Sequence, residues 1–101
     1  MTGDLDIIAR IEEKTGVKLQ RLPMEEIYKA ARSYGEIKRG YALDREKRVT
    51  GLRLDRMHLR PVLDEIPLLE QVKRLNLAYC GLEQDDIAFL LQLRELKELK
   101  I

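Results

Sequence analysis

Two side chains of this 101-residue chain could serve nucleophilic or acid–base chemistry, the single histidine His58 and the single cysteine Cys80. A catalytic histidine needs a positioned partner, and neither a serine nor a cysteine stands at a recognisable spacing from His58. The apolar periodicity around Cys80 turns its thiol inward, where it behaves as a small inert hydrophobic group. We therefore expect His58 to be a solvated turn residue, and we expect no catalytic residues and no enzymatic activity.

Paired carboxylates could hold a metal ion or exchange protons, and the chain has two such pairs, Glu25-Glu26 and Asp85-Asp86. Each pair falls at the expected start of a helical segment, where the helix dipole stabilises negative charge. The ligand spacing of an EF-hand is absent. A lone cysteine supports neither an internal disulfide nor a zinc site built on paired cysteines. We expect these carboxylates to cap helices, and we expect neither a metal nor a cofactor.

A local basic cluster in the segment Lys38–Arg48 could contact phosphate or nucleic acid. Acidic residues interrupt the cluster, and Tyr41 is the only aromatic residue nearby that could stack on a base. The whole chain has 19 basic and 18 acidic residues, so no strong overall field attracts nucleic acid, membranes or acidic substrates. We favour a solvated hairpin tip, and phosphate or nucleic-acid binding through Lys38–Arg48 is the alternative function.

An internal repeat occupies the second half of the chain, which contains 14 of the 18 leucines. The apolar pattern around Leu52 recurs around Leu75 and again around Leu99, and the second interval is one residue longer than the first. Such a regular recurrence is the signature of stacked structural units that bury their apolar residues jointly. The recurring positions that we expect to form the core are Val49, Leu52, Leu54, Met57, Leu59, Val72, Leu75, Leu77, Cys80, Leu82, Leu96 and Leu99.

The spacing within each repeat predicts one short strand and one helical return. Two leucines that lie two residues apart point to the same side of a strand. Apolar residues then recur every three positions from Ile66 to Val72 and from Leu90 to Leu96, which indicates a helical or 3₁₀ segment. A single long amphipathic helix is the alternative, and interruptions by glycine and proline argue against it.

This arrangement matches the leucine-rich repeat pattern L-x-x-L-x-L-x-x-N/C-x-L. Cys80 occupies the N/C position in the second repeat, whereas Met57 occupies it in the first. We predict an α/β fold in which residues 49–101 form about two and a half repeats of a leucine-rich repeat solenoid. The strands would form a short parallel sheet, and the returns would be helical or 3₁₀.

Residues 1–48 lack the repeat and predict an N-terminal cap made of helices and a β-hairpin. Asp4–Lys14 has the pattern of an amphipathic helix whose apolar face includes Leu5, with Gly16 as its stop. A second helix would begin at Pro23 and end at Gly35, with an apolar stripe that we list as Met24, Ile27, Tyr28, Ala31 and Tyr34. Gly40–Leu43 and Arg48–Leu54 would pair as a hairpin and cover the edge of the first repeat strand.

The segments Asp4–Leu19 and Gly40–Leu59, the latter with its G-Y-x-L-D…R-V-T-G-L-x-L sequence, resemble the amino-terminal region of bacterial Roco-type leucine-rich repeat proteins. The resemblance covers about a third of the chain and extends through the repeats. It implies a protein-interaction array at the start of a larger signalling protein. It does not imply GTP hydrolysis, because the chain contains no G-x-x-x-x-G-K-[ST] motif.

The strand positions between the core leucines should face solvent and bind a protein partner, because arginine and tyrosine are common among interface hot spots. The residues predicted for this surface are Arg53, Asp55, Arg56, Arg74, Asn76, Tyr79 and Lys100. An ordinary polar face that binds nothing is the alternative.

No basic segment leads into an apolar run at the N-terminus, and no apolar run is long enough to cross a bilayer. Together with the lone cysteine, this favours a cytoplasmic protein without a membrane partner. The chain ends at Ile101 inside the third repeat. Either further repeats or a GTPase module follow, or the uncapped edge pairs with a second copy to give a homo-oligomer.

Overall fold

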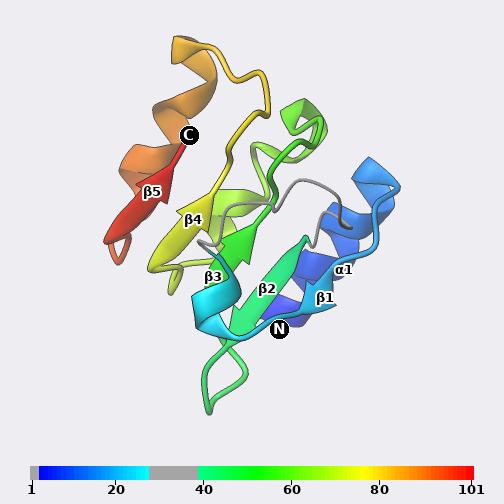
Figure 1. The fold of residues 1–101 in the computed structure, drawn as a ribbon, viewed down its shortest axis with the longest axis vertical. Helices are drawn as coiled ribbons and strands as arrows, with labels where there is room; N and C mark the ends of the chain where they lie inside the picture. Colours follow the sequence, from blue (N-terminus) through cyan, green and yellow to red (C-terminus); the bar gives the residue numbers. More distant parts are fainter. Residues whose placement is uncertain (1–2, 28–38) are drawn as a thin grey trace.

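The computed structural model describes residues 3–27 and 39–101, which form a mixed α/β fold around a single sheet (Figure 1). The elements of this part of the chain are α1 (Asp4–Thr15), β1 (Gln20–Arg21), η1 (Met24–Ile27), β2 (Gly40–Leu43), β3 (Val49–Arg53), η2 (Arg60–Val62), η3 (Ile66–Leu68), β4 (Arg74–Asn76), η4 (Gln84–Gln92) and β5 (Glu98–Lys100), where η denotes a 3₁₀ helix. The strands are ordered β1-β2-β3-β4-β5. All neighbouring strands are parallel except β2 and β3. The predicted α/β class is confirmed.

The first helix begins and ends as its sequence predicts, within one residue. The carboxylate of Asp6 accepts a hydrogen bond from the N–H of Gly3 at 3.1 Å. Gly16 ends the helix with a left-handed φ of 71°, and its N–H donates to the carbonyl of Glu12 at 2.8 Å. The expected orientation was wrong for Leu5, which is exposed, whereas Asp4 is buried. The helix turns Asp4 inward because that carboxylate accepts hydrogen bonds from the start of β3.

The predicted hairpin is confirmed as β2 and β3, which pair antiparallel. Its turn is held by Asp44, whose side-chain Oδ1 accepts the backbone N–H groups of Glu46 and Arg48, both at 2.9 Å. A feature that the sequence did not indicate is β1, which extends the sheet by pairing parallel to β2. Of the predicted second helix, the described part is the short η1. The positions Tyr28, Ala31, Tyr34 and Gly35 lie outside the described residues.

The three strands of the internal repeat align at the offsets found in the sequence. Leu52 pairs with Leu75, and Leu75 pairs with Leu99. Between the strands the chain returns through 3₁₀ segments, η2 and η3 after β3 and η4 after β4. The buried apolar positions of the first two strands and their turns are Val49, Leu52, Leu54, Met57, Leu59, Val72, Leu75 and Leu77. These positions were predicted correctly.

Burial decreases toward β5, where the core differs from the one that the sequence predicts. Leu99 has 41% of its surface exposed although its register partners Leu52 and Leu75 are fully buried. Cys80, Leu82 and Leu96 are half-buried and pack against the core cluster. The difference arises because β5 is an edge strand, so no further coil within the described residues covers its leucine.

The sheet separates two apolar layers of unequal size. On one face, α1 and the returns enclose the main core, in which Ile7, Ile8 and Ile11 join the leucines. On the other face, Leu22, Ile27 and Ala42 form a small cluster beneath η1. No helix among the residues described is long and apolar enough to cross a membrane.

Two groups of polar contacts attach α1 to the repeat strands and returns. Asp4 accepts hydrogen bonds from the Nε of Arg48 at 3.1 Å and from the N–H of Val49 at 2.9 Å. At the other end of the helix, the carboxylate of Glu65 accepts hydrogen bonds from Arg10 and Lys14, both at 3.0 Å. The pKa of Glu65 is lowered, mainly by the hydrogen bond from Arg10 and next by the hydrogen bond from Lys14. The helix is therefore fixed to β3 at its start and to the return after β3 at its end.

Candidate functional site

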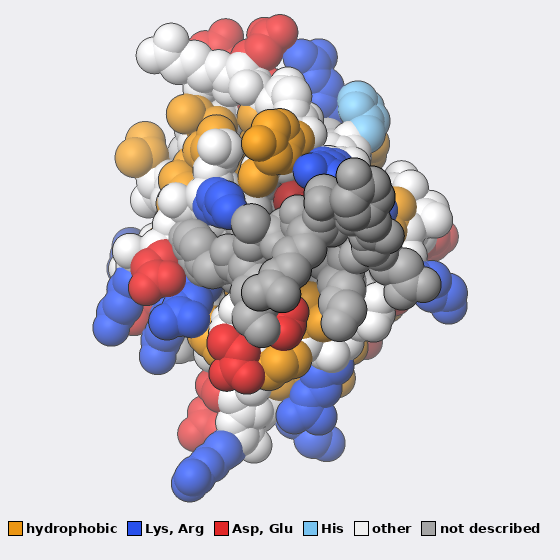
Figure 2. Space-filling view, viewed as in Figure 1, with side chains coloured by type: hydrophobic (Ala, Val, Ile, Leu, Met, Phe, Trp, Pro, Cys, Tyr) orange, Lys and Arg blue, Asp and Glu red, His pale blue; other side chains and the backbone are white. Residues whose placement is uncertain are grey.

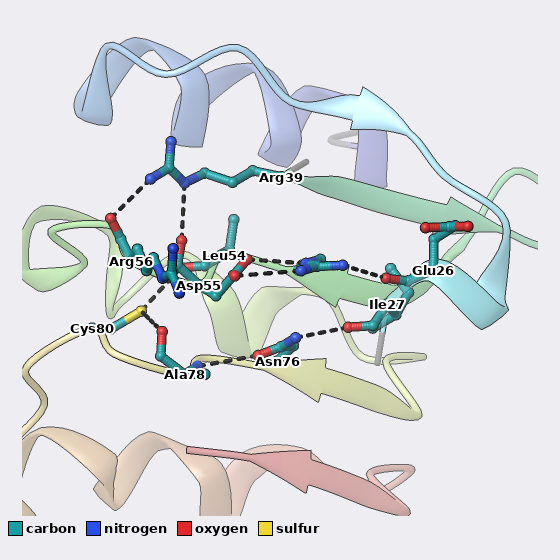
Figure 3. Close-up of polar contacts among 10 residues, drawn as sticks. Glu26, Ile27, Arg39, Leu54, Asp55, Arg56, Asn76, Ala78 and Cys80 are labelled. Carbon is teal, nitrogen blue, oxygen red and sulfur yellow. Dashed lines mark hydrogen bonds and ion pairs between the residues drawn. The ribbon is translucent and has the colours of Figure 1, made fainter. Parts of the chain in front are cut away.

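Part of the predicted binding face is covered by the protein's own η1 segment (Figure 3). The guanidinium of Arg53 on β3 donates to the carbonyl of Glu26 at 2.7 Å. The side-chain amide of Asn76 on β4 donates to the carbonyl of Ile27 at 2.9 Å. Both acceptors are backbone carbonyls of η1, so these bonds hold the backbone of that segment. The η1 segment is thereby attached to two neighbouring strands.

The expectation that Arg53, Asp55 and Asn76 face solvent was wrong. Their exposed fractions are 3%, 3% and 1%. Arg53 forms an ion pair with Asp55, with Nε and Oδ1 3.0 Å apart, and Asn76 accepts the N–H of Ala78 at 3.1 Å. Polar residues were expected to be exposed because strand side chains alternate, but η1 covers that side of the sheet. The three side chains stabilise the fold through these contacts and are not available to a partner.

Gly51 gives η1 the space to lie close to β3. A Cβ atom at this position would lie 2.8 Å from the sulfur of Met24 and 2.9 Å from Cγ1 of Ile27. A side chain would thus displace the segment. A glycine in the middle of a strand is a known indication that another segment approaches closely. This was the sequence signal that could have revealed the covered face.

Arg39 fixes the turn that follows β3. Its guanidinium donates to the carbonyl of Asp55 and to the carbonyl of Arg56, both at 2.9 Å (Figure 3). The sequence places this arginine in the basic cluster that could contact phosphate. Its hydrogen bonds instead hold the backbone of the turn from which Arg56 projects.

The exposed part of the predicted surface is centred on Arg56 and Tyr79. These residues occupy equivalent turns, after β3 and after β4, and the guanidinium carbon of Arg56 lies 5.3 Å from the centre of the Tyr79 ring. Tyr79 has 80% of its surface exposed. Both residues have a φ of 59°, a left-handed conformation that costs a residue other than glycine about 1–2 kcal/mol. We call these two side chains the arginine–tyrosine pair.

The last two predicted contact residues lie toward the open edge of the sheet. Arg74 on β4 forms an ion pair with Glu98 on β5 at 3.1 Å, and both side chains are partly exposed. Lys100 is half-buried. The predicted surface is therefore divided, because η1 covers its β3 side, whereas the arginine–tyrosine pair, Arg74 and Lys100 remain accessible.

His58 occupies the solvated position expected from the sequence, whereas Cys80 is less buried than expected. The thiol of Cys80 is half-buried and donates to the carbonyl of Leu54, with 2.9 Å between sulfur and oxygen. This contact joins one repeat to the next. Burial raises the pKa of the Cys80 thiol, which disfavours the reactive thiolate. His58 is exposed after the β3 turn.

The remaining candidate groups serve local structure or stay in solvent. Asp86 accepts the N–H of Glu83 at 3.0 Å at the start of η4, as expected of a capping residue. No cluster of metal-ligating side chains occurs within residues 3–27 and 39–101.

The basic cluster is dispersed. Lys38 lies outside the described residues, Arg48 forms an ion pair with Asp4, and Arg45 and Lys47 are exposed at the hairpin tip. Figure 2 shows acidic and basic side chains interspersed on the visible face rather than gathered by sign.

The chain was also compared with known proteins. No protein-family model matches the sequence, and neither a curated protein nor a solved structure matches it.

Proposed function

We propose that the chain is a non-catalytic protein-binding module with the architecture of a leucine-rich repeat solenoid. The alignment of equivalent repeat positions in neighbouring strands supports this proposal, as do the 3₁₀ returns and the leucines buried jointly between repeats. The hydrogen bond from Cys80 to the preceding repeat is in keeping with the N/C position of that pattern. Solenoids of this kind present their repeated turns and strands as an extended binding surface.

The binding surface in this proposal is the arginine–tyrosine pair together with Arg74 and Lys100. The observation that carries it is that Arg56 and Tyr79 stack on each other at equivalent turns and both project from left-handed backbone, a conformation that Lys47 at the hairpin tip shares without such a contact being found for it. Glycine would adopt this conformation at less cost, yet two large side chains stand at equivalent turns and project into solvent. Arginine and tyrosine are also the residue types most often found at interface hot spots. Contacts with a partner best explain why two large side chains occupy these strained positions.

The test separates binding from folding by placing glycine at the strained positions. We expect Arg56→Gly and Tyr79→Gly to change the free energy of unfolding by less than about 1 kcal/mol, because relief of strain offsets the lost cation–π contact. A protein partner captured with the wild-type chain should bind each variant at least about tenfold more weakly by calorimetry.

The matched control is Arg45→Ala, which removes one exposed charge from the hairpin tip at a residue without left-handed backbone. It should bind the partner as the wild type does. Unchanged affinity in Tyr79→Gly, or a loss in the control equal to that of the pair, would contradict the proposed surface. A salt titration with generic RNA tests the alternative, since phosphate binding through the hairpin would weaken steeply as salt rises.

A further inference from the structure

The outer edge of β5 offers an unpaired backbone and an exposed leucine. On its inner side, the N–H of Glu98 donates to the carbonyl of Lys73 at 3.0 Å, and the carbonyl of Lys100 accepts the N–H of Leu77 at 2.7 Å. Backbone groups of successive residues in a strand point to opposite edges, so the N–H and C=O of Leu99 point away from β4. Within the part of the chain that the structure describes, no strand pairs with this edge.

We propose that the edge binds β5 of a second copy of the chain, in an antiparallel pair centred on Leu99. In such a pair, the N–H of each Leu99 donates to the carbonyl of the other, which forms the reciprocal hydrogen-bonded pair of an antiparallel ladder. The two leucine side chains then lie opposite each other on the core face, which buries surface that is 41% exposed in the single chain. The arrangement is a closed two-fold dimer.

The sequence of β5 is complementary to itself in this register. When Leu99 lies opposite Leu99, each Glu98 lies opposite a Lys100, in the positions where cross-strand side chains approach most closely. Glu98 already contacts Arg74 at 3.1 Å. A row of alternating charge would therefore run from Arg74 to Glu98 of one chain and on to Lys100 of the second copy. A parallel pair in register would place like charges opposite each other and is disfavoured. The charges thus select one partner orientation.

The test measures the mass of the 101-residue chain in solution by sedimentation velocity over a range of concentrations. The strands are short, so we expect a dimer with a dissociation constant of about 10–100 µM. Glu98→Lys and Lys100→Glu each create two like-charge pairs, and each variant should dimerise at least about tenfold more weakly. Mixing the two variants places opposite charges at both pairs again, so the mixture should form a heterodimer.

The control is Lys18→Glu, an equal change of charge in the exposed link between α1 and β1, which should dimerise as the wild type does. Circular dichroism verifies that each variant is folded. Amide exchange of Leu99 should slow as the wild-type concentration rises. A wild-type chain that stays monomeric at about 1 mM, far above the expected dissociation constant, would overturn the proposal. Oligomers larger than two, or a mixture that remains monomeric, would overturn it as well.

Discussion

At the scale of single residues, buried polar side chains join separate parts of the molecule. Arg53 connects three parts of the molecule, since it lies on β3, pairs with Asp55 in the following turn and donates to Glu26 in η1. Buried charges are costly unless they are paired and hydrogen-bonded, so removing one partner leaves the other in an unfavourable environment. An exposed arginine such as Arg56 carries no such penalty, and its side chain remains accessible to other molecules.

Arg53→Ala should therefore lower the free energy of unfolding by about 3 kcal/mol, because Asp55 would remain buried without its ion-pair partner. Arg74→Ala is the matched control, since its ion pair with Glu98 is partly exposed and should contribute less than about 1 kcal/mol. Urea denaturation of both variants measures the difference. Equal losses in the two variants would show that the buried pair has no special structural role.

At the scale of elements, the repeats are held at one side by α1 and on the strand face by η1. The contacts of α1 are electrostatic at both ends, through Asp4 and Glu65, and apolar between them. The contacts of η1 depend on the space left by Gly51 and on hydrogen bonds from Arg53 and Asn76. Each element thus fits a position on the strands or returns that the repeat pattern alone does not specify.

The attachment of α1 through Glu65 should depend on pH. The folded-state pKa of Glu65 is lowered, so its stabilising effect is fully present above the unfolded pKa of about 4.3 and is lost as pH falls through the folded value. Glu65→Gln should reduce the free energy of unfolding by about 1 kcal/mol at pH 7, since Arg10 and Lys14 are partly exposed. The difference from the wild type should shrink once the pH is below that unfolded pKa.

The neighbouring Asp64 provides the control for this experiment, because its side chain is 79% exposed and lies 3.9 Å from Lys14. Asp64→Asn should leave the pH dependence of stability unchanged. Thermal denaturation from pH 3 to 7 measures both variants. A difference between Glu65→Gln and the wild type that persists undiminished at pH 3 would argue against the proposed attachment.

At the scale of the whole molecule, the sheet is closely packed at its centre and open at β5. Leu52, Leu75 and Leu99 occupy the same position in three neighbouring strands, yet only the last is substantially exposed. A repeat buries its leucines only when another layer covers it. Stability should therefore be unevenly distributed across the three strands.

Substitution of the three register-related leucines by alanine tests this gradient. Leu52→Ala and Leu75→Ala should each reduce the free energy of unfolding by about 2–5 kcal/mol, as is typical of fully buried leucines. Leu99→Ala should cost about 1 kcal/mol or less in dilute solution, where the chain is monomeric. Denaturant titrations at low micromolar concentration provide the comparison. A loss at Leu99 as large as that at Leu75 would contradict the gradient.

The sequence by itself determined the strands of the repeat, their register, the hairpin and the first helix. These features depend on spacing along the chain: leucines two residues apart identify a strand, and the regular recurrence from Leu52 to Leu75 to Leu99 aligns each strand with the next. Asp44 in the turn and Gly16 at the helix end act on their own neighbours, so their effects can be inferred without knowledge of the fold.

Only the tertiary structure decided which polar strand residues are available to a partner. Arg53 and Tyr79 both belong to the predicted face, yet Arg53 is covered by a segment 27 residues away along the chain and Tyr79 is not. A polar residue at an alternating strand position fits either solvent or a buried hydrogen bond equally well. The outcome depends on where η1 packs, because a segment distant in sequence can satisfy a polar group as completely as water does.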